Sequence, residues 1–351
     1  MSQKERETFL FSFALDVSLG KNLQKSKVKA KTVDLYVAAA ASFATDALLP
    51  DPRFRECDLG KSRVPKFPLL QQLLTTMSKW EGEKRKCFSL SSEILLALQK
   101  IAKAHPLHSL EHCAVDAIAL GVWTGSRCSE YCPCNGCKGT TEPYSLVPTL
   151  PYTREFAGQP IALIPEDFSF LSASKRFVRW KCAQKSAENV TIRFRFDKAG
   201  NGNVNRRTFR RHPDDSFFCP VRTSFRILTR WLLCSGKGFT PAFVFRPPSP
   251  SYRCFLNDQM VNKMLRYATE QAYPEDDHIF RINIQKISTH SIRVFACCLL
   301  AAANLSEAQI EFRLRWKSDC WKEYLRESLS EVDETSQKLF PHIASPPNLD
   351  D

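Results

Sequence analysis

Two short motifs in this chain pair an arginine with a second polar residue at helical spacing. The stretch WTGSRCSEY places Arg127 just after a Thr-Gly turn and Glu130 three residues later. Side chains three residues apart share a helix face, so Glu130 can hold the guanidinium of Arg127. The stretch HSIR pairs His290 with Arg293 in the same way. Either pair alone also fits a surface ion pair or a helix cap, so neither motif is decisive by itself.

Three further residues complete this set of reactive side chains. Lys198 lies in DKAGNGN, the expected turn of a β-hairpin, and Trp316 and Tyr324 lie in RWKSDCWKEYL. The indole N–H can only donate a hydrogen bond, and a tyrosine hydroxyl attacks well only where a cationic setting favours its oxyanion. Aromatic residues at such positions are usually part of a core, so the order of all these residues along the chain is the more informative signal.

A strongly basic stripe surrounds the expected hairpin. VTIRFRF (190–196) alternates apolar residues with arginines, as a half-buried strand does, and VNRRTFRR (204–211) is the returning strand. Between residues 175 and 211 only Glu188 and Asp197 oppose the Lys and Arg side chains. We interpret the stripe as a surface that contacts phosphates, with a solvated polar face as the alternative. The expected contacts are Arg193, Arg195, Arg206, Arg207, Arg210 and Arg211.

The elements that position these residues are mostly helical. Apolar residues repeat at helical spacing in the segments 32–48, 67–86, 90–104, 223–236 and 256–273, and in 110–131, where a Thr-Gly turn separates a helix from a new helix start. We therefore predict a mainly α fold with a small antiparallel β-sheet, of the α+β class. The His-Pro break at 105–106 separates two domains. The expected organisation is a basic leader at 1–27, a helical domain at 28–104, a larger mixed domain at 105–330 and an acidic tail at 331–351.

Length and charge restrict the class of protein. A chain of 351 residues exceeds a typical single domain, and the net charge of +13 indicates a polyanionic partner such as nucleic acid. An anionic membrane surface is the other candidate, although no amphipathic anchor is evident. No apolar run reaches transmembrane length, and no convincing signal-peptide cleavage site follows the N-terminal apolar segment. We expect an intracellular protein, nuclear if the source is eukaryotic, with its 14 cysteines as free thiols.

The order of the reactive residues resembles that of the tyrosine recombinases, the phage-type integrase family. An arginine comes first, then a lysine on a hairpin, a His-x-x-Arg motif, a tryptophan and a near-terminal tyrosine. TGSRCSE is similar to the family's first-arginine motif, STHSIR to its His-x-x-Arg helix and RWKSDCWKEYL to its closing segment. The likeness covers roughly residues 28–330 and is greatest with recombinases of mobile elements. The Trp-to-Tyr spacing is one residue shorter than in the family.

This resemblance implies a specific chemistry and a specific set of catalytic residues. The family cleaves and rejoins DNA strands through a covalent 3′-phosphotyrosine intermediate, without a metal, ATP or other cofactor. The implied catalytic residues are Arg127, Lys198, His290, Arg293, Trp316 and Tyr324, with Glu130 in a supporting role. The implied partner is double-stranded DNA, clamped between a helical core-binding domain at 28–104 and the catalytic domain, with four copies on paired sites.

Several alternatives stay open in the sequence. Lys181 and Lys185 compete with Lys198 as the general acid, and Tyr267 and Tyr273 fit the nucleophile less well than Tyr324. A catalytically inactive DNA-binding descendant of a mobile-element recombinase would retain the basic surface without the chemistry. The third alternative is a zinc-dependent nucleic-acid-binding protein, because four cysteines lie close together at C-x3-C-x-C-x2-C spacing. These are Cys128, Cys132, Cys134 and Cys137. A loop without metal is the interpretation we favour for them.

Overall fold

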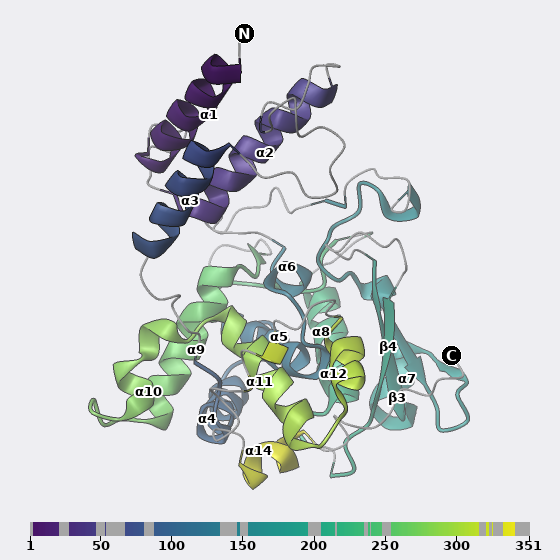
Figure 1. Ribbon diagram of the computed structural model, residues 1–351. Helices are drawn as coiled ribbons and strands as arrows, with labels where there is room; N and C mark the ends of the chain where they lie inside the picture. Colours follow the sequence, from purple (N-terminus) through teal and green to yellow (C-terminus); the bar gives the residue numbers. More distant parts are fainter. Residues whose placement is uncertain are drawn as a thin grey trace. The chain divides into compact units, whose positions relative to one another are not determined.

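The computed structural model is mainly helical and divides into two compact units, residues 1–85 and 86–351 (Figure 1). Its described residues contain one four-stranded antiparallel sheet and one short pair of strands. This confirms the predicted class, mainly α with a small antiparallel sheet. The structure describes residues 3–20, 28–46, 53, 67–80, 88–133, 146–147, 154–195, 205–214, 216–234, 238, 240–247, 254–315, 321–322, 325 and 333–340. Within these ranges, no helix has both the length and the apolar character needed to cross a membrane.

The first unit is a bundle of three helices that contact one another. They are α1 (Gln3–Ser18), α2 (Ala30–Asp46) and α3 (Pro68–Trp80). Their common core consists of Leu10, Ala14, Val17, Val33, Val37, Phe67, Leu70 and Leu74. The prediction of a basic leader at 1–27 is therefore wrong for residues 3–18, because α1 buries apolar side chains against the other two helices.

The second unit contains most of the secondary structure. Its longer helices are α4 (Ser92–Lys103), α5 (Leu110–Thr124), α7 (Trp180–Ser186), α8 (Pro220–Leu233), α9 (Asp258–Ala272), α11 (Thr289–Ala302) and α12 (Glu307–Leu314). Its short elements are α6 (Cys128–Tyr131), η2 (Arg154–Phe156), η3 (Pro165–Asp167), α10 (Ile279–Ile282), η4 (Ile284–Lys286) and α14 (Glu334–Leu339). Helix α4 contacts α9 and α5, so it belongs to this unit. The predicted boundary at 104/105 therefore differs from the structural one at 85/86.

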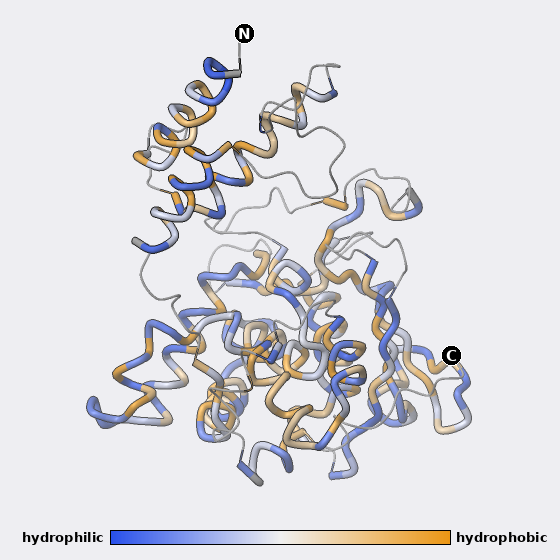
Figure 2. The backbone as a smooth tube through the Cα atoms, in the orientation of Figure 1, coloured by the Kyte–Doolittle hydropathy of each residue, from blue (hydrophilic) through white to orange (hydrophobic). Residues whose placement is uncertain are grey.

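Helix α5 is the central element of the second unit. Every residue from His112 to Thr124 is buried, and a helix that is apolar on all sides is typical of a core surrounded by other helices. It contacts α4, α8, α9 and α11. Figure 2 shows hydrophobic residues, in orange, concentrated in these central helices. The helix begins at an N-cap, Ser109, and ends at Gly125. The burial of α5 fixes the position of the turn that follows it.

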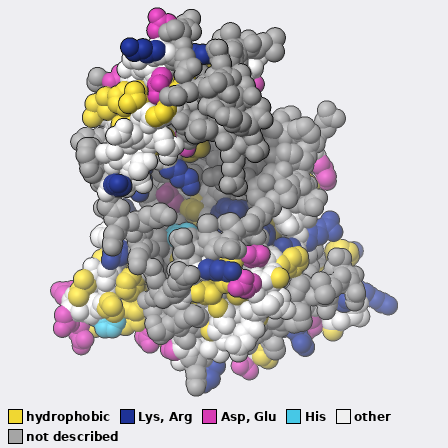
Figure 3. Space-filling model, in the orientation of Figure 1, with side chains coloured by type: hydrophobic (Ala, Val, Ile, Leu, Met, Phe, Trp, Pro, Cys, Tyr) yellow, Lys and Arg dark blue, Asp and Glu magenta, His cyan; other side chains and the backbone are white. Residues whose placement is uncertain are grey.

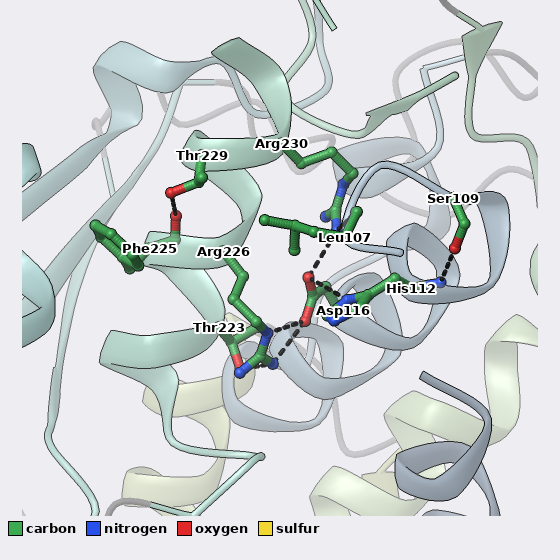
Figure 4. A network of polar contacts seen from close by, with 9 residues as sticks. All are labelled: Leu107, Ser109, His112, Asp116, Thr223, Phe225, Arg226, Thr229 and Arg230. Carbon is green, nitrogen blue, oxygen red and sulfur yellow. Dashed lines mark hydrogen bonds and ion pairs between the residues drawn. The ribbon is translucent and has the colours of Figure 1, made fainter. Parts of the chain in front are cut away.

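A buried ionic network fixes α5 against α8 (Figure 4). Asp116 is fully buried, and its Oδ1 accepts hydrogen bonds from Nε and Nη2 of Arg226 at 2.8 and 2.6 Å. Its Oδ2 accepts a hydrogen bond from Nη1 of Arg230 at 2.8 Å. Burial alone would raise the pKa of Asp116, but the charges of Arg226 and Arg230 hold that pKa below its ordinary value. The carboxylate stays ionised, so the network ties the two helices together at neutral pH.

The four-stranded sheet has the order β2-β1-β3-β4. Its strands are β1 (Phe168–Leu171), β2 (Phe177–Val178), β3 (Asn189–Phe194) and β4 (Asn205–Arg210), and the separate short pair is β5 (Val244–Phe245) with β6 (Cys254–Phe255). Strand β3 alternates half-buried and buried residues, with Val190, Ile192 and Phe194 on the buried face. The predicted hairpin is therefore confirmed as β3 and β4, since an alternating pattern is typical of a sheet with one face on a core.

Part of the predicted acidic tail belongs to the core of the second unit. Helix α14 lies within residues 331–351, and Phe340 directly after it is 1% exposed. The Phe340 ring contacts Trp123 and Phe295, and Ser92 donates a hydrogen bond to Asp333 at 2.8 Å. The prediction of a tail at 331–351 is wrong for residues 333–340, because buried Phe340 anchors this segment in the core.

Candidate functional site

The turn after α5 places Arg127 at the start of α6. Gly125 ends α5 with a φ of 56°, in the left-handed region that glycine adopts without a steric penalty. A Cβ added at Gly125 would also overlap the side chain of Leu314. Two separate requirements thus favour glycine here, and the turn that carries Arg127 lies directly on the end of α12.

Glu130 interacts mainly with Arg315, an arginine that is not among the predicted site residues. Its Oε1 and Oε2 accept hydrogen bonds from Nη1 and Nη2 of Arg315, each at 2.7 Å. Its Oε2 also accepts the backbone N–H of Arg127 at 2.7 Å, whereas the guanidinium of Arg127 approaches Oε1 only to 4.0 Å. The expectation that Glu130 holds the Arg127 guanidinium is therefore corrected. Glu130 holds Arg315 in a bidentate ion pair and fixes the backbone of Arg127.

Arg315 is a buried arginine that pairs with a buried carboxylate and stacks on an aromatic ring. It is 6% exposed, adopts a φ of 57° and ends α12. Its guanidinium stacks over the Phe194 ring, with 3.6 Å between Cζ and the ring centroid. Burial alone would raise the pKa of Glu130, but the charge and hydrogen bonds of Arg315 hold that pKa below its ordinary value. The pair is thus ionised at neutral pH, and it links α6 to the residue that precedes Trp316.

Helix α11 carries the His-x-x-Arg pair. Ser288 caps its first turn, and Oδ1 of Asn262 accepts the N–H of Thr289 at 2.7 Å. Arg293 is 8% exposed, and its Nη2 donates a hydrogen bond to the carbonyl of Leu314 at 3.3 Å. His290 is half-buried on the same helix. The predicted helix start and the shared location of His290 and Arg293 are therefore present in the structure.

Two consecutive residues at the end of α12 join the arginine-bearing segments. Leu314 contacts the Gly125 turn through its side chain and accepts the hydrogen bond of Arg293 through its carbonyl. Arg315, the next residue, pairs with Glu130 on α6. Helices α5 and α11 also lie very close together, because a Cβ at Gly121 would come within 2.9 Å of Ile292. The structure thus brings the Arg127 turn and the His290–Arg293 helix to one place.

The electrostatic setting of His290 favours its neutral form. Burial lowers the pKa of His290, and the nearby charge of Arg293 lowers that pKa further. Since an ordinary imidazole has a pKa of about 6.5, this side chain is neutral at pH 7. A neutral imidazole beside a cationic site can accept a proton from a hydroxyl group.

Three of the predicted catalytic residues, Lys198, Trp316 and Tyr324, lie outside the described residues. Their neighbours along the chain are described: β3 and β4 flank the expected turn with Lys198, and Arg315 directly precedes Trp316. The roles of these three residues therefore stay predictions.

The alternative lysines and tyrosines are all described. Lys181 and Lys185 are exposed on α7, and Tyr267 is half-exposed on α9. The hydroxyl of Tyr273 lies 2.7 Å from Oγ of Ser91 and donates a hydrogen bond to Glu93 at 2.8 Å. Burial raises the pKa of Tyr273, and the hydrogen bond with Glu93 contributes to this increase. Such a hydroxyl is a poor nucleophile, so Tyr273 is the weaker candidate.

Two of the arginines predicted to contact phosphates are engaged inside the protein instead. Arg195 is 5% exposed and donates hydrogen bonds to Asp167, Gln159 and the carbonyl of Ala162. Arg207 is 7% exposed, and its Nε and Nη2 both donate to the carbonyl of Phe312. The predictions for Arg195 and Arg207 are therefore wrong, because all three nitrogens of each buried guanidinium already donate to acceptors inside the protein.

The other four arginines predicted to contact phosphates differ in exposure. Arg211 donates hydrogen bonds to the carbonyls of Ala187, Ala183 and Gln184 at the end of α7, so its guanidinium also has a structural role. Arg193 is half-buried and pairs with Asp167. Arg206 and Arg210 are exposed. Lys and Arg side chains, in dark blue, lie on the side of the molecule where β3 and β4 run (Figure 3).

The cysteine-rich segment is only partly described. Cys128 is half-buried, and Cys132 is 1% exposed. Cys134 and Cys137 lie outside the described residues. Within the described part of the chain, no group of three or more His, Cys, Asp or Glu side chains could hold a metal ion. The four-cysteine zinc site is thus an untested alternative.

No protein-family model and no curated protein matches this chain. Among solved structures, it is similar to residues 82–397 of the Tn1549 transposon integrase, in complex with circular intermediate DNA. The two share 12% sequence identity, and the match covers 93% of this chain and 81% of that chain. The TM-score is 0.35, and a similarity at this level supports no conclusion about function.

Proposed function

We propose that this protein cleaves and rejoins DNA strands through a covalent phosphotyrosine intermediate, as the tyrosine recombinases do. One observation carries the proposal. Arg127 and Arg293 come from segments far apart in the sequence, yet both segments contact Leu314. The chain continues from Leu314 through Arg315 to Trp316, the next residue that the family resemblance assigns to the site. The contacts of Leu314 with the Arg127 turn and with Arg293 support a single phosphate site between these segments.

The proposed reaction is the transfer of a phosphodiester from a DNA 5′-oxygen to Tyr324. The phenolic oxygen attacks phosphorus and forms the new P–O bond, while the bond from phosphorus to the 5′-oxygen breaks. The phenolic proton passes to neutral His290, and Lys198 supplies a proton to the departing 5′-oxygen. The products are a 3′-phosphotyrosyl strand and a strand with a free 5′-hydroxyl. Reversal of these steps with a different 5′-hydroxyl joins the strand to a new end.

Arg127 and Arg293 stabilise the transition state of this reaction. Attack adds negative charge to the nonbridging oxygens of the phosphate, and each guanidinium offers two parallel donors that stay charged at all relevant pH values. The indole N–H of Trp316 adds one further donor. Preorganised donors act strongly because they need not reorient during the reaction. The buried pair of Glu130 and Arg315 supplies this rigidity by holding the backbone of Arg127.

The remaining parts of the proposal concern DNA binding. Arg193, Arg206 and Arg210 contact the phosphates of duplex DNA, and the helical N-terminal region serves as a further DNA-binding domain. Four copies assemble on paired sites, inside the cell and in the nucleus of a eukaryote. These points rest on the net charge of +13 and on the family resemblance.

The experiment that tests this function measures covalent capture of DNA. Duplexes of randomised sequence, each with a nick, are incubated with the protein, and complexes that survive denaturation with detergent are recovered and sequenced. Arg127→Lys and Arg293→Lys should each slow capture by about a hundredfold or more, because lysine lacks the planar pair of parallel N–H donors with which a guanidinium binds two phosphate oxygens. Arg281→Lys, in a surface ion pair with Asp276 and Glu270, is the matched control and should capture DNA at the native rate. Native rates in both test variants would contradict the proposed role of Arg127 and Arg293, and absence of any covalent complex would favour the inactive DNA-binding descendant.

A further inference from the structure

The four-stranded sheet also carries a cavity with binding chemistry, which shares Arg193 and Arg206 with the proposed duplex contacts. A cavity of about 700 Å³ is lined by residues from all four strands and from α12. In the strand register, Ser169 pairs with Thr191, and Thr191 pairs with Thr208, so three hydroxyl side chains form a row across the sheet. Arg193 lies opposite Arg206 in the next row. Hydroxyls and guanidiniums side by side are donors for phosphate oxygens.

The charge of this cavity is unbalanced among the described residues. Glu166 and Asp167 are its acidic lining residues, and Asp167 already pairs with Arg193 and Arg195. Lys175 and Arg206 are exposed lining residues, and in the described part of the chain neither has a carboxylate partner. Like charges opposite each other on neighbouring strands repel, so the Arg193–Arg206 pair is a site where a bound anion would stabilise the sheet.

A buried arginine points to the same conclusion. Arg313 on α12 lines the cavity and is 5% exposed, yet its Nε has no hydrogen-bond partner among the described residues. Its described interaction is a cation–π contact with Phe209, with 5.9 Å between Cζ and the ring centroid. Burial lowers the pKa of Arg313 to about 10, so the guanidinium stays charged at neutral pH. An unsatisfied buried cation costs free energy unless a ligand supplies the missing acceptor.

Two exposed aromatic side chains distinguish this cavity from a simple anion site. Phe177 on β2 is 83% exposed, and Phe312 on α12 is 45% exposed. Both side chains line the cavity, and they lie at opposite edges of the sheet. Phe177 belongs to the edge strand β2. Phe312 lies beside the other edge strand, β4, because its carbonyl accepts a hydrogen bond from Arg207 on that strand. Aromatic faces combined with cations are the features with which proteins bind unpaired bases and the phosphates between them.

We propose that this sheet surface binds single-stranded nucleic acid, with a base stacked on Phe177 and phosphates held by Lys175, Arg206 and Arg313. An exposed phenyl ring favours a single strand over a duplex, because the base faces of a duplex are covered by their neighbours. It also favours nucleic acid over an acidic peptide, which offers carboxylates without bases. The surface differs from the proposed cleavage site and does not depend on cleavage activity.

The test is fluorescence anisotropy of a labelled oligothymidylate of about 12 nucleotides, within the usual range of site sizes for such surfaces, binding to the full chain. Phe177→Ala should weaken binding by about 5- to 150-fold, the range found for loss of one base–aromatic stack. Phe177→Leu should weaken binding in the same direction, whereas Phe177→Trp should retain it. A purely hydrophobic patch would instead tolerate leucine. Because Phe177 is so exposed, these changes leave the fold intact.

Charge is tested with a matched pair of exposed arginines. Arg206→Gln should reduce the salt dependence of oligothymidylate binding by about 0.7 in log–log slope, as the loss of one phosphate contact to a single strand does. Arg176 is exposed beside Lys175 but does not line the cavity, so Arg176→Gln should leave the slope unchanged. Phe177→Ala should still form the covalent complex with nicked duplex DNA, which separates this site from the proposed function.

Three results would overturn the proposal. In the first, Phe177→Ala and Phe177→Leu bind the oligonucleotide as tightly as the native chain. In the second, Arg206→Gln and Arg176→Gln change the salt dependence equally. In the third, poly-glutamate competes as well as oligothymidylate of the same charge, which would identify a general polyanion surface.

Discussion

Glu130→Gln removes the charge of one partner in the buried pair that links α6 to the end of α12. Glu130 and Arg315 are 4% and 6% exposed, and both carboxylate oxygens lie 2.7 Å from guanidinium nitrogens. The variant leaves Arg315 charged and buried without a counterion. Loss of one partner from a buried pair costs about 3–5 kcal/mol, and we expect a decrease of that size in the free energy of unfolding of residues 86–351.

Chemical denaturation measures this decrease, and hydrogen exchange at the amides of α12 reports where it acts. Adding Arg315→Met to Glu130→Gln should recover most of the lost stability, because no buried charge then lacks a partner. Glu270→Gln is the control, since Glu270 is half-exposed in its pair with Arg281 and should change stability by less than about 1 kcal/mol. A decrease below about 1 kcal/mol in Glu130→Gln, or no recovery in the double variant, would refute the role of the pair.

The pH dependence of this effect has a definite sign. The pKa of Glu130 is lower in the folded chain than its ordinary value, so its charge stabilises the folded state. That contribution is fully present above the unfolded pKa of about 4.3 and is lost as the pH falls through the lower folded pKa. The difference between the native chain and Glu130→Gln should therefore be constant near neutral pH and shrink in acid.

Three further predictions address the scaffold and the proposed chemistry. Asp116→Asn should lower the free energy of unfolding by about 3–5 kcal/mol in the same denaturation assay, with Glu270→Gln again as the exposed control, because two arginines lose their buried counterion. Gly125→Ala should destabilise the chain more than Gly158→Ala: both glycines have positive φ, which costs about 1–2 kcal/mol for alanine, but only Gly125 has a neighbouring side chain in the way. Lys198→Ala should slow cleavage of ordinary DNA in a capture assay, and the defect should largely vanish when sulfur replaces the bridging 5′-oxygen, since a thiolate leaves without a proton.

Local patterns in the sequence predicted those features of the fold that neighbouring residues determine. The hairpin was predictable because Val190, Ile192 and Phe194 alternate with polar residues, and that alternation matches the burial of β3. Helix α5 was predictable together with its glycine stop. The boundary between the two units was not predictable from the sequence. Helix α4 has an ordinary amphipathic pattern, and its contact with α9, which is distant in sequence, assigns it to the second unit.

The partners of the charged residues could not be predicted from the sequence, because they are distant along the chain. Arg195 and Arg207 lie in a basic stripe and look like surface residues, yet their acceptors, Asp167 and the Phe312 carbonyl, are distant in sequence. Arg315 has no motif of its own, and its adjacency to Trp316 is the one signal that could have marked it. Glu130 was assigned to Arg127 because the two share a helix turn, whereas the structure pairs Glu130 with a residue 185 positions later.

The most direct test of the proposed chemistry is to locate the covalent bond between protein and DNA. The native chain is trapped on a nicked duplex, digested with protease and nuclease, and the modified peptide is identified by mass spectrometry. We predict a 3′-phosphonucleotide on Tyr324, and we predict that Tyr324→Phe forms no covalent complex while it binds the same duplex with nearly native affinity. A covalent complex that persists in Tyr324→Phe, or a phosphonucleotide on a different residue such as Tyr267 or Tyr273, would contradict the assignment.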